Sequence, residues 1–179
     1  MKRSVILWSV FGFLFVSVAG VLLHFLYDWL GQSAVVGVFS AVNESIWEHM
    51  KLLYVSLMLF ALLESRFLAP ERSNFWCVWL LTTVVGLVTI PLLYYTYTGA
   101  LGVTADWFNI AIYFIATSLV FWLQARLLRS ERACVVPTET AVALIVIIGI
   151  LFVMFTFFPP RLPLFRDPTD GTFGIEKTL

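Results

Sequence analysis

The sequence has little charge. Of its 179 residues only 12% are Asp, Glu, Lys or Arg, whereas 61% are hydrophobic. An average soluble domain carries about 25% charged and about 45–50% apolar residues. A soluble core cannot absorb this much apolar surface, so the lipid bilayer must solvate part of the chain. The formal net charge is zero, which argues against nucleic acid as a partner.

Cysteine is also scarce, since Cys77 and Cys134 are the two in the chain. They form no Cys-x-x-Cys spacing and have no histidine beside them, which argues against a cysteine-based metal site. If the N-terminus is cytoplasmic, both lie near the cytoplasmic face, where thiols stay reduced. We therefore expect no structural disulfide.

Long apolar runs are abundant by contrast. They predict an all-α, polytopic membrane protein, because about 20 mostly apolar residues cross a bilayer as a helix. The five expected transmembrane helices cover residues 4–28, 44–66, 74–98, 106–129 and 139–158. They form a bundle over residues 1–160, which a tail follows at residues 161–179. Residues 32–42, between the first two helices, are apolar but too short to cross and predict a re-entrant or interfacial segment.

The second of these helices is anomalous. Its uncharged part, from Leu52 to Leu63, has twelve residues and rises only about 18 Å. To cross the membrane the helix must extend backward and carry Glu48, His49 and Lys51 into the bilayer or its outer interface. At its other end Glu64 is expected to be a solvated interface charge.

Basic residues are distributed unevenly between the two sides of the predicted bundle. The segments on the side of the N-terminus contain seven of them: Lys2, Arg3, Arg66, Arg72, Arg126, Arg129 and Arg132. The short connections on the other side are nearly free of Lys and Arg. This asymmetry predicts a cytoplasmic N-terminus and an outer C-terminal tail in the plasma membrane.

One cluster of ionisable residues falls at the outer membrane face. His24 and Asp28 are spaced i, i+4 and share a face of the first helix. We expect the second helix to begin at Asn43 as N-cap, with Glu44 in its first turn. Other polar residues of the third and fourth helices are expected at the same level: Tyr94, Tyr95, Tyr97, Asp106 and Asn109.

In the second helix, Glu44 and Glu48 then fall along one stripe and His49 along its neighbour. Mixed imidazole and carboxylate groups suit zinc, iron or manganese. This predicts a divalent-metal site with His24, Asp28 and His49 as ligands. Glu44 and Glu48 would be the catalytic carboxylates of a metal-assisted hydrolase that acts on a lipid or envelope substrate. No HExxH or other established ligand pattern is present.

Three alternatives to this site are open. Structural packing also explains the cluster, with His24 paired to Asp28 and Glu48 paired to Lys51. It also fits a transporter or a proton or ion pathway, because intramembrane charges mark such routes. In the third, the protein is a non-catalytic assembly subunit that binds a membrane protein partner or a second copy of itself. In every case the bilayer is a partner.

The outer cluster also carries a resemblance. The run Val42-Asn43-Glu44-Ser45-Ile46-Trp47-Glu48-His49-Met50-Lys51, with His24 before it and a tail from Asp167 to Ile175, resembles an uncharacterised family of small bacterial multi-pass membrane proteins. The resemblance implies a bacterial cytoplasmic-membrane protein and supplies no activity. Membrane ceramidase-like hydrolases bind zinc through three histidines, and this chain departs from that pattern because it has only two.

Overall fold

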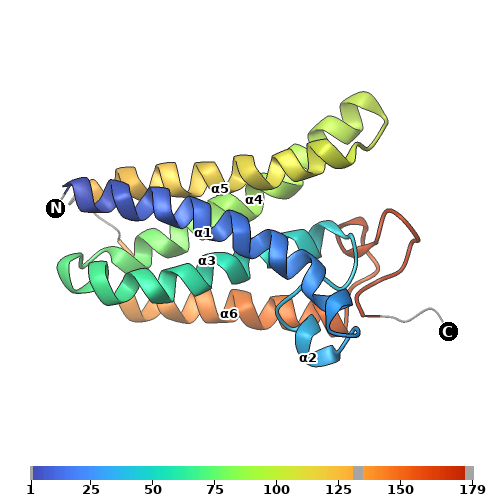
Figure 1. The fold of residues 1–179 in the computed structure, drawn as a ribbon, viewed down its shortest axis with the longest axis horizontal. Coiled ribbons are helices and arrows are strands. Elements are labelled where there is room, and N and C mark those ends of the chain that lie inside the picture. Colours follow the sequence, from blue (N-terminus) through green and yellow to red (C-terminus); the bar gives the residue numbers. More distant parts are fainter. Residues whose placement is uncertain (1, 131–134, 176–179) are drawn as a thin grey trace.

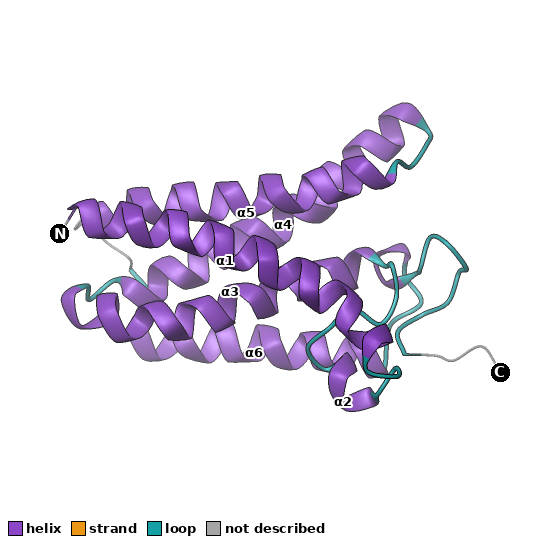
Figure 2. Ribbon diagram, viewed as in Figure 1, coloured by secondary structure: helices purple, strands orange, loops and turns teal. Residues whose placement is uncertain are grey.

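Five long helices make up the protein in a computed structural model that describes residues 2–130 and 135–175. They are α1 (Lys2–Trp29), α3 (Ile46–Leu68), α4 (Phe75–Leu101), α5 (Asp106–Arg129) and α6 (Thr138–Phe157). Each is long and apolar enough to cross a membrane, and Figure 2 shows no strand in the described part. The prediction of an all-α, five-span membrane protein is confirmed.

Three short elements complete the described chain. The helix α2 (Ala34–Gly37) lies in the connection between α1 and α3, where a short interfacial or re-entrant segment was expected. The 3-10 turns are η1 (Ala69–Glu71), directly after α3, and η2 (Pro163–Phe165), in the tail. Figure 1 shows α2 and the tail together at the end of the bundle opposite the N-terminus.

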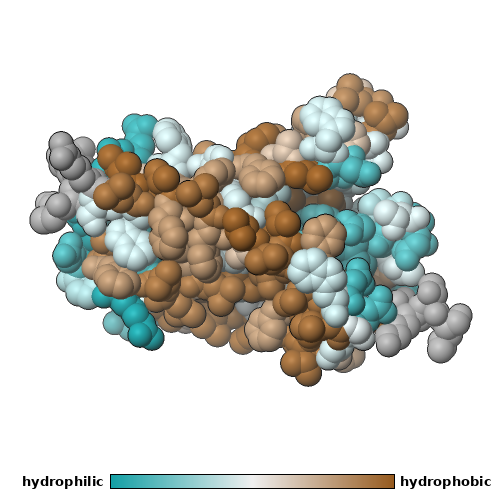
Figure 3. All heavy atoms as spheres, in the orientation of Figure 1, coloured by the Kyte–Doolittle hydropathy of each residue, from teal (hydrophilic) through white to brown (hydrophobic). Residues whose placement is uncertain are grey.

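The outside of the bundle is apolar along its length. Large side chains that point outward include Leu7 and Leu14 of α1 and Val146 and Ile150 of α6, all between 50% and 70% exposed. Figure 3 shows this apolar surface across the middle of the molecule, with most hydrophilic residues at its two ends. Such a belt is what contact with lipid acyl chains requires.

The central helix is α3, which packs against α1, α4 and α6. Its side chains Leu53, Leu57 and Phe60 are completely buried. This position explains why α3 tolerates so many polar residues: the face that carries them lies against other helices, so buried polar groups find hydrogen-bonding partners within the protein.

Glu64, at the inner end of α3, is one of these buried groups, and the expectation of a solvated charge is wrong. Its side chain is 0% exposed. The carboxylate oxygen Oε2 accepts hydrogen bonds from Trp79 Nε1 at 3.0 Å and Gln124 Nε2 at 2.8 Å. Because Glu64 faces α4 and α5, it cannot extend to water as a residue on the outer surface of a helix end would.

The expectation of reduced thiols is also wrong, because Cys77 is disulfide-bonded. Cys77 lies in the first turn of α4 and is 5% exposed. Cys134 lies outside the described residues.

Candidate metal site

The outer start of α3 differs by two residues from the expected one. The N-cap is Ser45, whose hydroxyl accepts the Glu48 N–H at 3.3 Å. Asn43 instead accepts the Ser45 N–H at 3.0 Å and donates through Nδ2 to Gly174 O at 3.0 Å. Glu44 therefore precedes the helix and does not share a helical stripe with Glu48.

The C-terminal tail holds this loop in place. The Asp167 carboxylate is 4% exposed and accepts the Glu44 N–H at 2.8 Å. The same carboxylate accepts the backbone N–H of Thr169 at 2.7 Å. Phe165 packs against Trp47 with ring centroids 4.7 Å apart. The backbone conformation at Glu44 thus depends on residues more than a hundred positions away.

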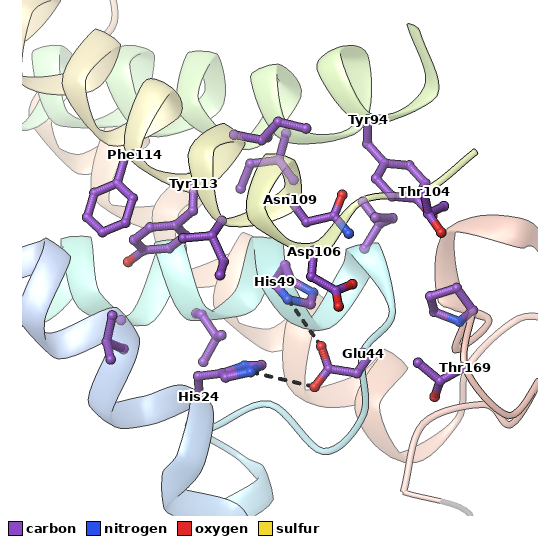
Figure 4. A pocket seen from close by; sticks show the side chains of 18 of the residues that line it. His24, Glu44, His49, Tyr94, Thr104, Asp106, Asn109, Tyr113, Phe114 and Thr169 are labelled. Carbon is purple, nitrogen blue, oxygen red and sulfur yellow. Dashed lines mark ion pairs between the residues drawn. The ribbon is translucent and has the colours of Figure 1, made fainter. Parts of the chain in front are cut away.

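Three side chains from separate parts of the chain converge at this loop. Glu44 Oε1 lies 3.5 Å from His24 Nε2 of α1, and Glu44 Oε2 lies 3.6 Å from His49 Nε2 of α3. One ligand atom from each residue lies within 4.8 Å of the other two. Figure 4 shows both imidazoles directed at the Glu44 carboxylate. We call His24, Glu44 and His49 the outer triad.

The two histidines differ in the contacts that their Nδ1 atoms make. His49 Nδ1 lies 2.9 Å from the carbonyl oxygen of Ser45. A carbonyl oxygen only accepts, so Nδ1 carries the proton and the Nε2 lone pair of a neutral ring is directed at Glu44. A backbone carbonyl that fixes the second nitrogen is a common feature of metal-binding histidines. The Nδ1 atom of His24 is buried and has no hydrogen-bonding partner among the described residues.

A cavity of about 480 Å³ lies beside the outer triad, and all three of its residues contribute to the lining. Of the five polar residues expected at this level, Tyr94, Asp106 and Asn109 line it from α4 and α5, whereas Tyr95 and Tyr97 are not part of the lining. Pro168 and Thr169 of the tail also line it. Figure 4 shows Asp106 extending from α5 toward the triad. Small-molecule sites commonly have volumes of about 300–1,000 Å³.

The other two predicted site residues lie elsewhere. Asp28 is exposed and accepts a hydrogen bond from Gln32 Nε2 at 3.1 Å. Glu48 is 1% exposed, and its Oε2 lies 2.5 Å from Lys51 Nζ. The structure brings together His24, Glu44 and His49 and leaves Asp28 and Glu48 out of the cavity lining.

The apolar tail residues Phe165, Phe173 and Ile175 suggest from the sequence a tail anchored over the outer pocket, and Phe165 does pack against Trp47. The sequence analysis missed Asp167, which makes the contact with Glu44. A signal did exist: Asp167-Pro168-Thr169 is typical of a turn in which the aspartate accepts hydrogen bonds from residues that follow it. The turn sequence does not indicate that Asp167 also accepts a hydrogen bond from Glu44.

The fold and the outer triad define a multi-pass helical membrane protein with a histidine and carboxylate pocket at one end of its bundle. The chain belongs to a family of unknown function, DUF6512, which it matches over residues 2–175. The resemblance to an uncharacterised family is thereby confirmed. Comparison with curated proteins found no match, and comparison with solved structures found none either.

Proposed function

We propose that the outer triad binds one divalent metal ion and that the protein is a metal-assisted hydrolase. The observation that carries the proposal is the convergence of three ligand atoms within 4.8 Å. Two ligands about 2.0–2.1 Å from a tetrahedral zinc are roughly 3.3 Å apart. The distances of 3.5 and 3.6 Å from Glu44 to the two imidazoles approach this separation. Zinc, iron and manganese all suit such ligands.

The outer triad would hold the ion through three ligands, and the ion would supply an activated water, as in catalytic zinc sites with two histidines and one glutamate. A bound ion lowers the pKa of that water. Asp106 is our candidate for the base, because Glu48 is already paired with Lys51. With an ion bound, Asp106 would accept the proton of a water whose oxygen bonds to the acyl carbon or phosphorus of an ester, and would return that proton to the alkoxide that leaves when the ester bond breaks.

The proposed substrate is a lipid or an envelope precursor, and the proposed location is the cytoplasmic membrane of a bacterium with the N-terminus inside. The basic residues at the end opposite the pocket support this orientation, whereas the disulfide of Cys77 at that end argues against it, because cytoplasmic thiols stay reduced. The site then faces the extracytoplasmic side, where such substrates are present.

A proton or ion pathway is the alternative. It is favoured by buried polar groups farther along the bundle, of which Ser56 and Thr83 have hydroxyls without a hydrogen-bonding partner among the described residues. Leu53, Leu57 and Phe60, all 0% exposed, lie on either side of Ser56 along α3. These apolar side chains favour the hydrolase over a continuous polar route. Conductance or proton uptake by purified protein in liposomes, unaffected by added metal, would favour the pathway.

The hydrolase proposal is tested first by metal content. Wild-type protein purified in mild detergent and loaded with zinc, iron or manganese should retain about one ion per chain, as three-ligand zinc sites do. His24→Ala and His49→Ala should lose it. Asp28→Ala is the matched control, because Asp28 is a carboxylate of the same helix end that makes no triad contact. A wild-type protein without stoichiometric metal, or equal loss in Asp28→Ala, would refute the site.

Activity is the second part of the test. The metal-loaded protein should hydrolyse ester bonds of lipids in a bacterial lipid extract, and Asp106→Asn should lose this activity while it keeps the ion. An Asp106→Asn variant with full activity would remove Asp106 from the mechanism.

A further inference from the structure

The cavity beside the outer triad extends deep into the membrane-spanning part of the bundle. Its lining on α5 runs from Asp106 to Phe114, and eight residues of helix rise about 12 Å. On α1 it runs from His24 one turn inward to Gly20. The triad occupies only the outer end of this space.

Polarity changes along that depth. The outer end carries Glu44, Asp106 and Thr169, whereas the inner part is lined by Val21, Ile112 and Phe114. A lipid in the leaflet on that side has the same order, with its ester groups near the interface and its chains toward the midplane. The apolar inner part favours a substrate with an apolar chain, because burial of apolar surface stabilises the bound chain. A fully water-soluble substrate would gain no such stabilisation there.

The residues beside the cavity also face lipid. Val21 and Phe25 of α1 are 46% and 45% exposed, and Ile110 of α5 is 59% exposed, although all three line the cavity. Figure 3 shows apolar residues continuing over this face toward a hollow below the tip of the α4–α5 hairpin. A chain can therefore enter from the bilayer between α1 and α5 without crossing water.

The inner end is closed by Tyr113. Its hydroxyl donates to Val16 O at 3.1 Å, and the ring lies so close to Gly20 that a Cβ atom there would collide with the hydroxyl. This contact fixes α5 against α1 and forms a floor. If an acyl chain is longer than the cavity, its remaining part must pass between α1 and α5 into the bilayer, past Val21 and Ile110.

From these observations we infer that the inner part of the cavity is a binding site for one acyl chain of a membrane lipid, which enters between α1 and α5 and presents its ester group to the outer triad. This inference rests on the proposed function and specifies its substrate as a membrane lipid.

Photolabelling tests it. Wild-type protein in nanodiscs that contain phosphatidylethanolamine with a diazirine in one acyl chain should be labelled preferentially at the cavity-facing residues of α1 and α5. Val21→Trp fills the entrance and should reduce that labelling several-fold, and Ile110→Trp is a second variant with the same expectation. Leu14→Trp is the matched control, because Leu14 is 56% exposed on the same helix and does not line the cavity.

The outcomes separate the two proposals. Labelling spread evenly over the apolar faces of all five helices, or unchanged in both entrance variants, overturns the acyl-chain site whatever the metal content. Concentrated labelling that Val21→Trp removes, with metal still bound, supports it. If the labelling is concentrated but no metal binds, the chain site stands and the hydrolase proposal fails.

Discussion

Two groups of charged side chains lie close together at the outer end of α3, and they are satisfied to different degrees. In the closed group, Lys51 Nζ lies 2.5 Å from Glu48 Oε2 and donates to Gly37 O and Thr156 Oγ1, each at 2.8 Å. Both charged side chains are at most 1% exposed. In the outer triad the contacts to Glu44 are 3.5 and 3.6 Å and the residues are partly exposed.

The difference indicates what each group is for. A charge in the membrane is costly, by about 2.5–3.5 kcal/mol on insertion scales, and the closed group offsets that cost with a complete set of partners. It links α2, α3 and α6. The outer triad keeps longer contacts and faces a cavity, so its ligand atoms remain free for another partner. Polar residues of similar type thus serve packing in one group and, in our proposal, metal binding in the other.

The largest effect is expected from breaking the closed group. Lys51→Ala leaves the Glu48 carboxylate buried without its cation, which should cost about 3–5 kcal/mol of unfolding free energy. Glu44→Ala in the triad should change stability by no more than about 0.5 kcal/mol, as surface substitutions do. The measurement is the unfolding free energy of both variants in mixed micelles. Equal destabilisation of the two variants would contradict the distinction between the closed group and the outer triad.

The next effect concerns the link between the tail and the triad. Asp167→Asn weakens the acceptor that holds the Glu44 N–H, so metal affinity should fall about 10- to 100-fold, as for other residues that orient ligands. Isothermal titration with zinc measures it. Asp170→Asn is the control, since Asp170 contacts Thr172 and not Glu44. The account of the tail would be wrong if both variants bound zinc as the wild type does.

A third polar group, at the inner end of α3, sharpens the comparison. Glu64→Ala leaves the buried donors of Trp79 and Gln124 without their acceptor and should cost about 1–3 kcal/mol. Glu64→Gln keeps an acceptor oxygen of the same shape and should cost less. Metal content should not change in either variant. A loss of metal would show that the inner and outer ends are coupled, which nothing in this comparison predicts.

The smallest effect lies in the tail turn. Hydrogen bonds from the backbone N–H and hydroxyl of Thr172 hold the pKa of Asp170 below its ordinary value of 3.8. A depressed pKa in the folded state contributes stability that is present above the unfolded pKa and is lost as pH falls through the folded one. Asp170→Asn should therefore lower the thermal midpoint slightly at neutral pH and not under strongly acidic conditions. An equal shift at both pH values would contradict this assignment.

The spans were predictable because they rest on hydrophobicity alone. All five predicted helices begin and end within a few residues of the observed ones, and the largest difference is at the end of α4, at Leu101. The start of α3 was less accurate. Asn43 and Ser45 are both good N-cap residues, and Ser45-x-x-Glu48 is the pattern of a capping box, which correctly identifies the cap and releases Glu44 from the helix.

The partners of the charged residues were harder to predict. His24 and His49 are visible as rare ionisable residues in apolar surroundings. That Glu48 turns toward Thr156, and Glu44 toward the two histidines, depends on contacts across more than a hundred residues in one case and on two separate helices in the other. Spacing along one helix carries no information about such contacts.

X-ray absorption at the zinc edge of the zinc-loaded protein tests the central claim most directly. The account predicts a first shell of nitrogen and oxygen at about 2.0–2.1 Å with the outer-shell scattering of two imidazoles, reduced to one imidazole in His24→Ala or His49→Ala if the ion is retained at high zinc. A zinc spectrum without imidazole scattering, or one unchanged in both variants, would contradict it.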